Sequence, residues 1–275
     1  MKKYLVIGNP IGHSLSPLIH NYWMKKYRLI DSVYEKLKIA EEDIENIIKE
    51  IRNNEIHGVN VTVPFKKKIM RFCDKLDKEA MNTGSVNTLH KTNNKIIGYN
   101  TDIKGFKETV AEIFYPSIDR LVKPSKNFFV LGAGGVTSSI IYSLRAELGS
   151  KGTIWVSNRT KKKADELKKL FSKIEVIDWG ELPPIACDMV INTTSVGLKK
   201  DENINIDFTN FNKKTIFYDL IYNPKETNFL KEARARGNKI INGQMMFLKQ
   251  AKEAFRIWTN ITPEIDDEMI KLLNI

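Results

Sequence analysis

The stretch Val130-Leu131-Gly132-Ala133-Gly134-Gly135-Val136 has the strongest bearing on the fold. The apolar run over residues 127–131 predicts a buried β-strand, and the residues after the glycines predict a helix. Glycines at such a junction permit a tight turn and let backbone N–H groups approach a pyrophosphate. The third glycine of the usual fingerprint would fall at Thr137, so the match is incomplete. We therefore expect a dinucleotide-binding turn, with a plain strand–helix junction as the alternative.

Strand and helix signals alternate along the rest of the chain, and this alternation is typical of α/β proteins with largely parallel sheets. Further strands are predicted at residues 4–8, 59–63, 86–89, 95–99, 153–157, 188–192, 215–219 and 238–241. The third and fourth of these are predicted to form a hairpin around Thr92-Asn93-Asn94.

The predicted helices carry apolar residues at helical spacing. Ser16-Pro17 is expected to open the first helix, with Ser16 as the N-cap and proline at the first helical position. In the second, isoleucines at 44, 47, 48 and 51 fall on one face. Two helices are expected to close the chain, the first of which has an apolar face made of Phe247, Leu248, Ala251, Phe255 and Trp258.

The length of 275 residues and the order of the elements predict two domains. A polar, proline-containing stretch from Tyr115 to Lys126 precedes the strand 127–131, and the helix before it begins near Lys104. We expect residues 1–103 together with residues 241–275 to form a mixed α/β domain. Residues 104–240 are expected to form a doubly wound parallel sheet of the Rossmann type.

Composition excludes several classes of protein. No apolar run is long enough for a membrane span, and the N-terminal apolar stretch is too short for a signal peptide. Cys73 and Cys187 lie far apart without a metal-like spacing, so we expect free thiols in a reduced, cytoplasmic protein. His13, His20, His57 and His90 form no metal-binding pattern, and we expect them to be structural or exposed.

The net charge of +11 has two interpretations. Lysines spread over solvated helix faces explain it, and so does the attraction of anionic ligands such as phosphates and carboxylates. Nucleic-acid binding is not favoured, because the basic runs Lys66–Lys68 and Lys161–Lys163 contain no interleaved aromatic residues.

The segment after residues 153–157 indicates which dinucleotide binds. An acidic residue there would bind the ribose hydroxyls of NAD and repel a phosphate. This chain has Ser157-Asn158-Arg159-Thr160, followed by Lys163. A guanidinium fork and an ammonium suit the 2′-phosphate of NADP. The alternative is a solvated helix start without a ligand.

Two further segments carry candidate chemistry. The strand 59–63 alternates Val59, Val61 and Val63 with polar residues, so one face is expected to be apolar, and Lys66 follows its end. Ser14 and Ser16 lie beside a predicted helix N-terminus, where two hydroxyls suit a carboxylate. Capping by Ser16 alone would explain one serine but not both.

The chain resembles the shikimate dehydrogenase family over its full length. The order and spacing of the matching segments are specific, although each segment is short. These segments are Gly12–Pro17, Asn60–Lys66, Gly84–Thr88, Gly98–Asp102, Gly132–Gly135, Asn158–Thr160, Asn192–Gly197, Tyr218–Pro224 and Gln250-Ala251. The resemblance implies reversible, NADPH-dependent reduction of 3-dehydroshikimate to shikimate in aromatic amino-acid biosynthesis, with the first domain binding substrate and the second binding NADP.

The resemblance also implies roles for single residues. It makes Lys66 and Asp102 the catalytic pair. Ser14 and Ser16 would hold the substrate carboxylate, and Tyr222 would contact the substrate. The ring hydroxyls would be bound by Thr62, Asn87, Asp102 and Gln250. NADP would be bound by Gly132, Gly134, Gly135, Val136, Asn158, Arg159, Thr160 and Lys163. The nicotinamide would be lined by residues near Thr194, Ile221, Gly243 and Met246.

The chain departs from the family pattern at two positions. Lys163 stands where the family often has arginine, which keeps the charge but loses the planar fork. Met245 stands where a second glycine is frequent. Asp102 could also serve as a helix N-cap after the hairpin, and that role is compatible with catalysis.

Three other functions remain to be distinguished. An NAD-dependent quinate/shikimate dehydrogenase is disfavoured by Arg159 and by the missing acid. A methylene-tetrahydrofolate dehydrogenase has a similar two-domain plan, but the serine pair and the Asn87–Asp102 set do not suit it. A non-catalytic NADP-sensing protein would need no Lys66–Asp102 pair. Monomer and homodimer are both compatible with the sequence.

Overall fold

A computed structural model of the chain describes residues 1–114, 125–149 and 151–273. The chain divides into two compact units, a first unit of Met1–Gly105 with Leu248–Asn274 and a second unit of Phe106–Phe247. The expected domain boundaries were 103/104 and 240/241, two and seven residues earlier than those of the units. The two boundaries observed between the units fall inside helices, one in α4 (Thr101–Phe114) and one in α8 (Gln244–Thr259). No loop therefore marks either of them. Most of the polar stretch from Tyr115 to Lys126 lies outside the described residues.

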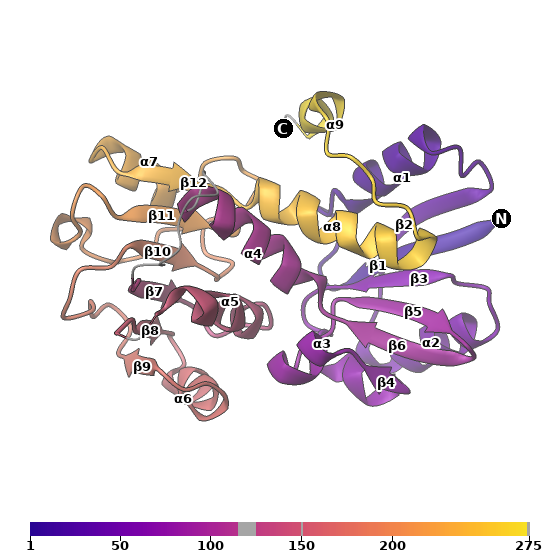
Figure 1. Ribbon diagram of the computed structural model, residues 1–275, viewed down its shortest axis with the longest axis horizontal. Coiled ribbons are helices and arrows are strands. Elements are labelled where there is room, and N and C mark those ends of the chain that lie inside the picture. The colour runs from indigo at the N-terminus through magenta and orange to yellow at the C-terminus, as the bar shows by residue number, and fades with distance from the viewer. Residues whose placement is uncertain (115–124, 150, 274–275) are drawn as a thin grey trace. The chain divides into compact units, whose positions relative to one another are not determined.

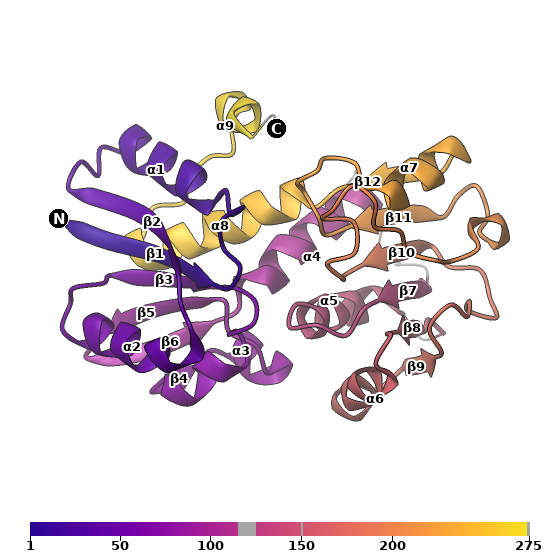
Figure 2. The same cartoon turned by 180° about the vertical axis from the view of Figure 1, so that it is seen from behind.

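The first unit is built on a mixed six-stranded sheet, shown from two sides in Figures 1 and 2. Its strand order is β2-β1-β3-β5-β6-β4. The two pairings that join β3, β5 and β6 are antiparallel, and the others are parallel. The strands are β1 (Lys2–Gly8), β2 (Ser32–Lys38), β3 (Gly58–Val61), β4 (Lys75–Leu76), β5 (Thr88–Thr92) and β6 (Lys95–Tyr99).

Helices cover both faces of this sheet because its central strands are buried on both sides. The four buried isoleucines of α2 (Ile44–Arg52) pack with Leu5 and Ile7 on one face. On the other face, Tyr4 contacts Trp258 of α8, whose ring nitrogen donates a hydrogen bond to the Leu89 carbonyl. The remaining helices of the unit are α1 (Ser16–Lys26), α3 (Lys78–Thr83) and α9 (Asp267–Leu272).

Two details of the predicted elements in this unit are wrong. The strand expected at 59–63 ends at Val61, and Val63 is 58% exposed, so it does not continue the apolar face. The chain turns there, because the Phe65 N–H donates to the Thr62 carbonyl at 2.9 Å. The hairpin forms as predicted, but its first strand begins at Thr88 and its turn is Asn93-Asn94, both with positive φ.

The second unit contains a parallel six-stranded sheet with the order β12-β11-β10-β7-β8-β9. This is the doubly wound order of dinucleotide-binding domains, and the switch point lies between β7 and β10. The strands are β7 (Phe128–Leu131), β8 (Ile154–Ser157), β9 (Ile174–Ile177), β10 (Met189–Asn192), β11 (Ile216–Asp219) and β12 (Lys239–Ile241). The strand β9 was not predicted from the sequence.

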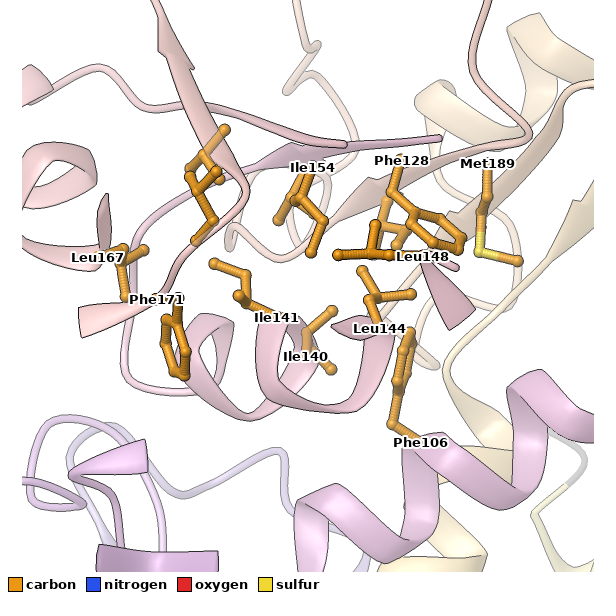
Figure 3. Close-up of a cluster of buried hydrophobic side chains, with 14 of the residues drawn as sticks. Phe106, Phe128, Ile140, Ile141, Leu144, Leu148, Ile154, Leu167, Phe171 and Met189 are labelled. Carbon is orange, nitrogen blue, oxygen red and sulfur yellow. The ribbon is translucent and has the colours of Figure 1, made fainter. Parts of the chain in front are cut away.

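Alternate residues of β7 enter different cores, as expected for a strand buried on both faces. Phe128 and Val130 pack with Ile140 and Leu144 of α5 (Thr137–Leu144), in the cluster drawn in Figure 3. Phe129 and Leu131 belong to the opposite cluster, which includes residues of α7 (Asn228–Ala235). The helix α6 (Lys161–Leu170) contributes Ala164 and Leu167 to the first cluster, whereas Leu170 is half exposed. No helix among the described residues is long and apolar enough to cross a membrane.

Candidate active site

Lys66 and Asp102 form a buried ion pair in the first unit. The Lys66 ammonium donates a hydrogen bond to Asp102 Oδ2 at 2.6 Å, and their side chains are only 11% and 7% exposed. Lys66 follows the turn at the end of β3, and Asp102 lies in the first turn of α4. Asp102 is therefore inside the helix and is not its N-cap. Removing a buried charged pair from water is costly unless further hydrogen bonds satisfy it.

Asn87 supplies one of those further hydrogen bonds. Its side-chain amide donates to Asp102 Oδ1 at 2.9 Å, and its side-chain oxygen accepts from the Thr101 backbone N–H at 2.8 Å. Gln250, from α8, approaches the Asn87 amide and the Thr101 hydroxyl with its side-chain oxygen, each at 3.5 Å. The structure thus brings together Lys66, Asp102, Asn87 and Gln250, which the resemblance had assigned to one site.

Ser14 and Ser16 lie next to each other before α1, with their hydroxyl oxygens 3.2 Å apart. The prediction that Ser16 is the N-cap is wrong: Ser16 is the first helical residue, Leu15 is the N-cap, and no side chain caps the helix. The Ser14 hydroxyl accepts from the Ser16 backbone N–H at 3.3 Å. Pro17 is therefore the second helical residue, whereas it was expected to be the first.

Thr62 lies just beyond β3, where its backbone N–H donates to the Ile7 carbonyl at 2.9 Å. Its side chain is partly exposed and approaches Gly8, where an added Cβ would lie 2.5 Å from the Thr62 methyl group. Gly8 therefore leaves the space that the Thr62 side chain occupies. No hydrogen bond joins Thr62 to Lys66 among the contacts described, so its place in the site stays a prediction.

The glycine turn of the second unit connects β7 to α5. Gly132 has φ +110°, which disfavours any other residue, and a Cβ there would lie 2.6 Å from Thr193 Oγ1. At Gly134, which is exposed, an added Cβ would meet nothing within 4 Å. The turn therefore presents open backbone at the switch point of the sheet, where parallel α/β sheets bind ligands. Gly135 and Val136 are partly buried and lead into the helix.

The end of β8 contributes polar side chains beside this turn. The Asn158 side-chain oxygen accepts from the Ala133 backbone N–H at 3.0 Å, and its amide donates to the Thr160 carbonyl at 2.8 Å. Asn158 thus joins the glycine turn to the start of α6. Arg159, Thr160 and Lys163 are exposed. Their guanidinium, hydroxyl and ammonium groups are a donor set that fits a phosphate ester.

The loops after β10 and β11 are held by a buried carboxylate. Asp219 accepts hydrogen bonds from the Thr227 hydroxyl at 2.6 Å, the Ile221 N–H at 3.0 Å and the Asn192 amide at 3.0 Å. Burial raises the pKa of the Asp219 carboxyl to about 6, although these hydrogen bonds act in the opposite direction. The Asn192 oxygen accepts from the Thr194 N–H at 2.9 Å. One carboxylate therefore fixes two of the segments that were predicted to line the nicotinamide.

The remaining predicted residues of the second unit are packed closely. A Cβ at Gly243 would lie 2.0 Å from the Leu220 carbonyl oxygen, so only glycine fits there. Met246 is buried in the core, where it packs with Tyr218 and other residues of that cluster. The ring of Tyr222 stacks on Phe247, with centroids 4.2 Å apart.

The described residues contain no group of three or more His, Cys, Asp or Glu side chains that could hold a metal ion. Cys73 and Cys187 are free, and burial raises the pKa of both thiols to about 12. Of the histidines, His20 is fully buried and stacks on Tyr34 at 4.3 Å, whereas His13 is exposed.

Four buried polar residues extend the site beyond the predicted set: Tyr34, Asn60, Thr88 and Thr101. Asn60 and Thr88 lie opposite each other in the β3–β5 register, and both side chains are buried. Two signals had marked Asn60: it is a polar residue between two valines of a strand, and it opens the matching segment Asn60–Lys66. No sequence pattern marked Tyr34, which lies in an edge strand that had not been predicted.

Comparison with known proteins identifies relatives over the full length. Residues 6–89 match the shikimate dehydrogenase substrate-binding domain family. The chain is 52% identical to the NADP(+) shikimate dehydrogenase of Pelagibacter ubique, covering 100% of this chain and 99% of that one.

Solved structures similar to this chain are also shikimate dehydrogenases. The crystal structure of the Thermus thermophilus shikimate 5-dehydrogenase in complex with NADP(H) and shikimate has a TM-score of 0.85 at 30% identity, covering 99% of this chain and 98% of that one. The Aquifex aeolicus shikimate dehydrogenase has a TM-score of 0.83 at 34% identity, covering 96% of this chain and 94% of that one.

Proposed function

The chain belongs to the shikimate dehydrogenase family, and we propose that it reversibly reduces 3-dehydroshikimate to shikimate with NADPH, using Lys66 and Asp102 as the catalytic pair. The observation that carries this proposal is the buried ion pair between these side chains, 2.6 Å apart, together with the Asn87 amide on the second carboxylate oxygen. The activity is that of an NADP-dependent oxidoreductase acting on a CH–OH group.

Lys66 supplies the proton in this mechanism. Reduction of a ketone places negative charge on its oxygen, and an ammonium within hydrogen-bond reach stabilises that charge and transfers a proton to it. In the oxidation direction, the same nitrogen accepts the proton of the hydroxyl that is oxidised. Asp102 holds the lysine in place, because the lysine lies against one carboxylate oxygen and Asn87 against the other. This leaves the remaining donors of the Lys66 ammonium for the substrate.

The other substrate contacts proposed here follow the chemistry of each group. Ser14 and Ser16 would bind the carboxylate of the substrate, since their adjacent hydroxyls can both donate at a helix start. Thr62 and Gln250 would bind ring hydroxyls. Tyr222 would contact the substrate through its phenol.

The second unit would hold the cofactor, which supplies the hydride when it is bound. The residues present fit it: Gly132, Gly134, Gly135 and Val136 form an open turn at the switch point, and exposed donors stand beside it. Asn158, Arg159, Thr160 and Lys163 would hold the 2′-phosphate. The nicotinamide pocket would be formed by Thr194, Ile221, Gly243 and Met246.

We also propose that the protein works in the cytoplasm on a small-molecule substrate, without nucleic acid or membrane. The two free cysteines, with thiols kept protonated by burial, support a reducing compartment. A monomer or a homodimer would both suit the reaction, because the residues proposed for it all belong to one chain.

The test is NADP reduction by the purified protein with shikimate, run beside NAD and beside quinate. Rapid turnover with shikimate and NADP alone supports the proposal. Comparable rates with NAD or quinate would identify a dehydrogenase of broader specificity. Tight NADPH binding without turnover of any pair would refute the proposal and favour an NADP-sensing protein.

A further inference from the structure

Tyr34 is the one fully buried residue of the edge strand β2. Its ring lies flat against His20, with centroids 4.3 Å apart. Its hydroxyl is 2.6 Å from the side-chain oxygen of Asn60 on β3. A buried tyrosine hydroxyl needs a hydrogen-bond partner, and here the partner is a side chain that leads toward the candidate active site.

The orientation of the Asn60 amide is fixed by a carbonyl group. Asn60 Nδ2 lies 3.2 Å from the Asn87 backbone carbonyl, which can only accept, and 3.0 Å from the Thr88 hydroxyl. The nitrogen must therefore face Asn87 and Thr88, and the oxygen must face Tyr34. It follows that Tyr34 donates to Asn60, and that Asn60 donates to Thr88.

The orientation of the Asn87 amide is fixed in the same way. The Thr101 backbone N–H can only donate, and it lies 2.8 Å from Asn87 Oδ1, so the nitrogen faces Asp102. The Thr88 hydroxyl accepts a hydrogen bond from the Asn60 amide and donates one to Asn87 Oδ1 at 3.0 Å. Every hydrogen in the series therefore points the same way, from Tyr34 to the Asp102 carboxylate.

We propose that Tyr34 is a positioning residue for Asp102, which it orients through this directed chain of hydrogen bonds (Tyr34 to Asn60 to Thr88 to Asn87 to Asp102). Each donor in such a series polarises the next one, and hydrogen bonds donated to a carboxylate favour its charged form. The chain ends on the carboxylate that holds Lys66 at 2.6 Å. This inference rests on the proposed function, because it gives Tyr34 a part in that reaction.

Three variants separate this role from simple packing. Tyr34→Phe removes only the hydroxyl and keeps the ring on His20. Thr88→Val breaks the middle of the chain with a side chain of the same shape. Tyr4→Phe is the matched control, because Tyr4 pairs with Tyr34 in the β1–β2 register and is 3% exposed, and none of the hydrogen bonds described involves its hydroxyl.

The first measurement is steady-state kinetics of shikimate oxidation by the purified variants. We expect Tyr34→Phe and Thr88→Val each to lower kcat about five- to tenfold, the effect of one hydrogen bond between neutral groups. The KM for shikimate should change much less, and Tyr4→Phe should match the wild type. The double variant should be no slower than Thr88→Val alone, because one break already interrupts the chain. The positioning role would be overturned if the kcat losses of the two single variants multiplied in the double variant, or if Tyr34→Phe left kcat unchanged.

The second measurement does not depend on turnover. In nitrogen–proton NMR spectra, Tyr34→Phe should shift the side-chain amide signals of both Asn60 and Asn87, and Tyr4→Phe should shift neither. In the Thr88→Val background, Tyr34→Phe should shift Asn60 alone. An unmoved Asn87 amide in Tyr34→Phe would overturn the chain itself. A wild-type protein that does not oxidise shikimate would refute the proposed function, and the amide shifts would still decide whether the chain exists.

Discussion

The two units hold their candidate functional residues in opposite ways. In the first unit, Lys66, Asn87 and Asp102 are buried and hydrogen-bonded to one another. In the second unit, four of the residues proposed to bind NADP are exposed: Gly134, Arg159, Thr160 and Lys163. A buried charge is held by few partners that water cannot replace, whereas an exposed charge is screened and has neighbours of the same sign. Substitutions should therefore have large effects in the first site and smaller, graded effects in the second.

The largest expected effect is that of Lys66→Ala. Loss of a general acid or base typically costs 10²–10⁴ in rate, so we expect kcat for shikimate oxidation to fall about 10³-fold. The dissociation constant of shikimate should change by only a few fold, because the contacts proposed for Ser14 and Ser16 with the carboxylate would remain. Single-turnover kinetics and equilibrium binding measure the two quantities separately.

The control for that prediction is Lys67→Ala, which removes the same charge from an exposed position next in the chain. It should leave kcat unchanged. Because Lys66→Ala leaves Asp102 buried without its cation, thermal unfolding must show that the variant is folded under the assay conditions. Equal losses in rate and in binding would make Lys66 a binding residue and would weaken the contrast between the units.

A second difference between the units, the sign of their pH dependence, can be tested with stability. His20 in the first unit is fully buried, and burial lowers its pKa to about 3. Its folded pKa is below the unfolded value, so the stability it contributes is present above pH 6.5 and is lost as the pH falls toward 3. Between pH 7 and pH 4 the loss in unfolding free energy from His20 is roughly 3 kcal/mol, at 1.36 kcal/mol per unit of pKa shift.

His20→Phe should remove that loss. The ring still packs among Tyr34, Trp23 and Phe255, and no group remains that must be kept neutral. Urea unfolding at pH 4 and at pH 7 should show a smaller difference in unfolding free energy in the variant than in the wild type. His13→Ala, which removes an exposed ring, is the control. A wild-type difference that survives His20→Phe would show that other groups dominate acid unfolding.

Asp219 in the second unit should act in the opposite direction. Its folded pKa, about 6, is above the ordinary value of 3.8, so the stability it contributes is present at low pH and is lost as the pH rises through 6. Over pH 4 to 7 the loss is roughly 2 kcal/mol. Asp219→Asn should abolish this loss, since the Asn oxygen can still accept from Ile221 and Asn192 while the Thr227 hydroxyl reorients.

The same urea series measures this variant, with Asp201→Asn at an exposed position as the control. In Asp219→Asn, stability should rise more steeply from pH 4 to pH 7 than in the wild type. If the slope does not change, the hydrogen bonds offset the effect of burial, so that the Asp219 carboxyl has the same pKa in the folded and the unfolded chain, and the two units would not differ in the sign of their pH dependence.

Much of the fold could be predicted because local patterns decide it. The parallel sheet of the second unit follows from apolar runs that alternate with helices. The strand ends could not be predicted, because a turn such as the one at Thr62 to Phe65 depends on one backbone hydrogen bond and interrupts no pattern. The strand Ile174–Ile177 has only four residues and lies at the edge of its sheet, so its apolar pattern is short.

The candidate site divides in the same way. Lys66, Asp102 and Asn87 were indicated by short motifs, and the structure places them in contact. The route from Tyr34 to them crosses strands that lie more than 20 residues apart in the chain. Neither spacing nor composition reveals which way those side chains point. The Ser16 cap was predicted wrongly for the same reason, since the helix begins one residue earlier than the serine motif suggested.

The smallest expected effect is that of Arg159→Gln in the second unit. Arg159 is exposed. Three more exposed cations follow it closely in the sequence: Lys161, Lys162 and Lys163. Loss of one screened charge-assisted hydrogen bond should raise the KM for NADP about tenfold and leave the KM for NAD unchanged. Lys162→Gln, with the same loss of charge nearby, should change the KM for NADP much less. If Arg159→Gln raised the KM for NADP by a factor as large as the kcat loss in Lys66→Ala, Arg159 would be enclosed when NADP binds. Exposure would then no longer separate the two sites.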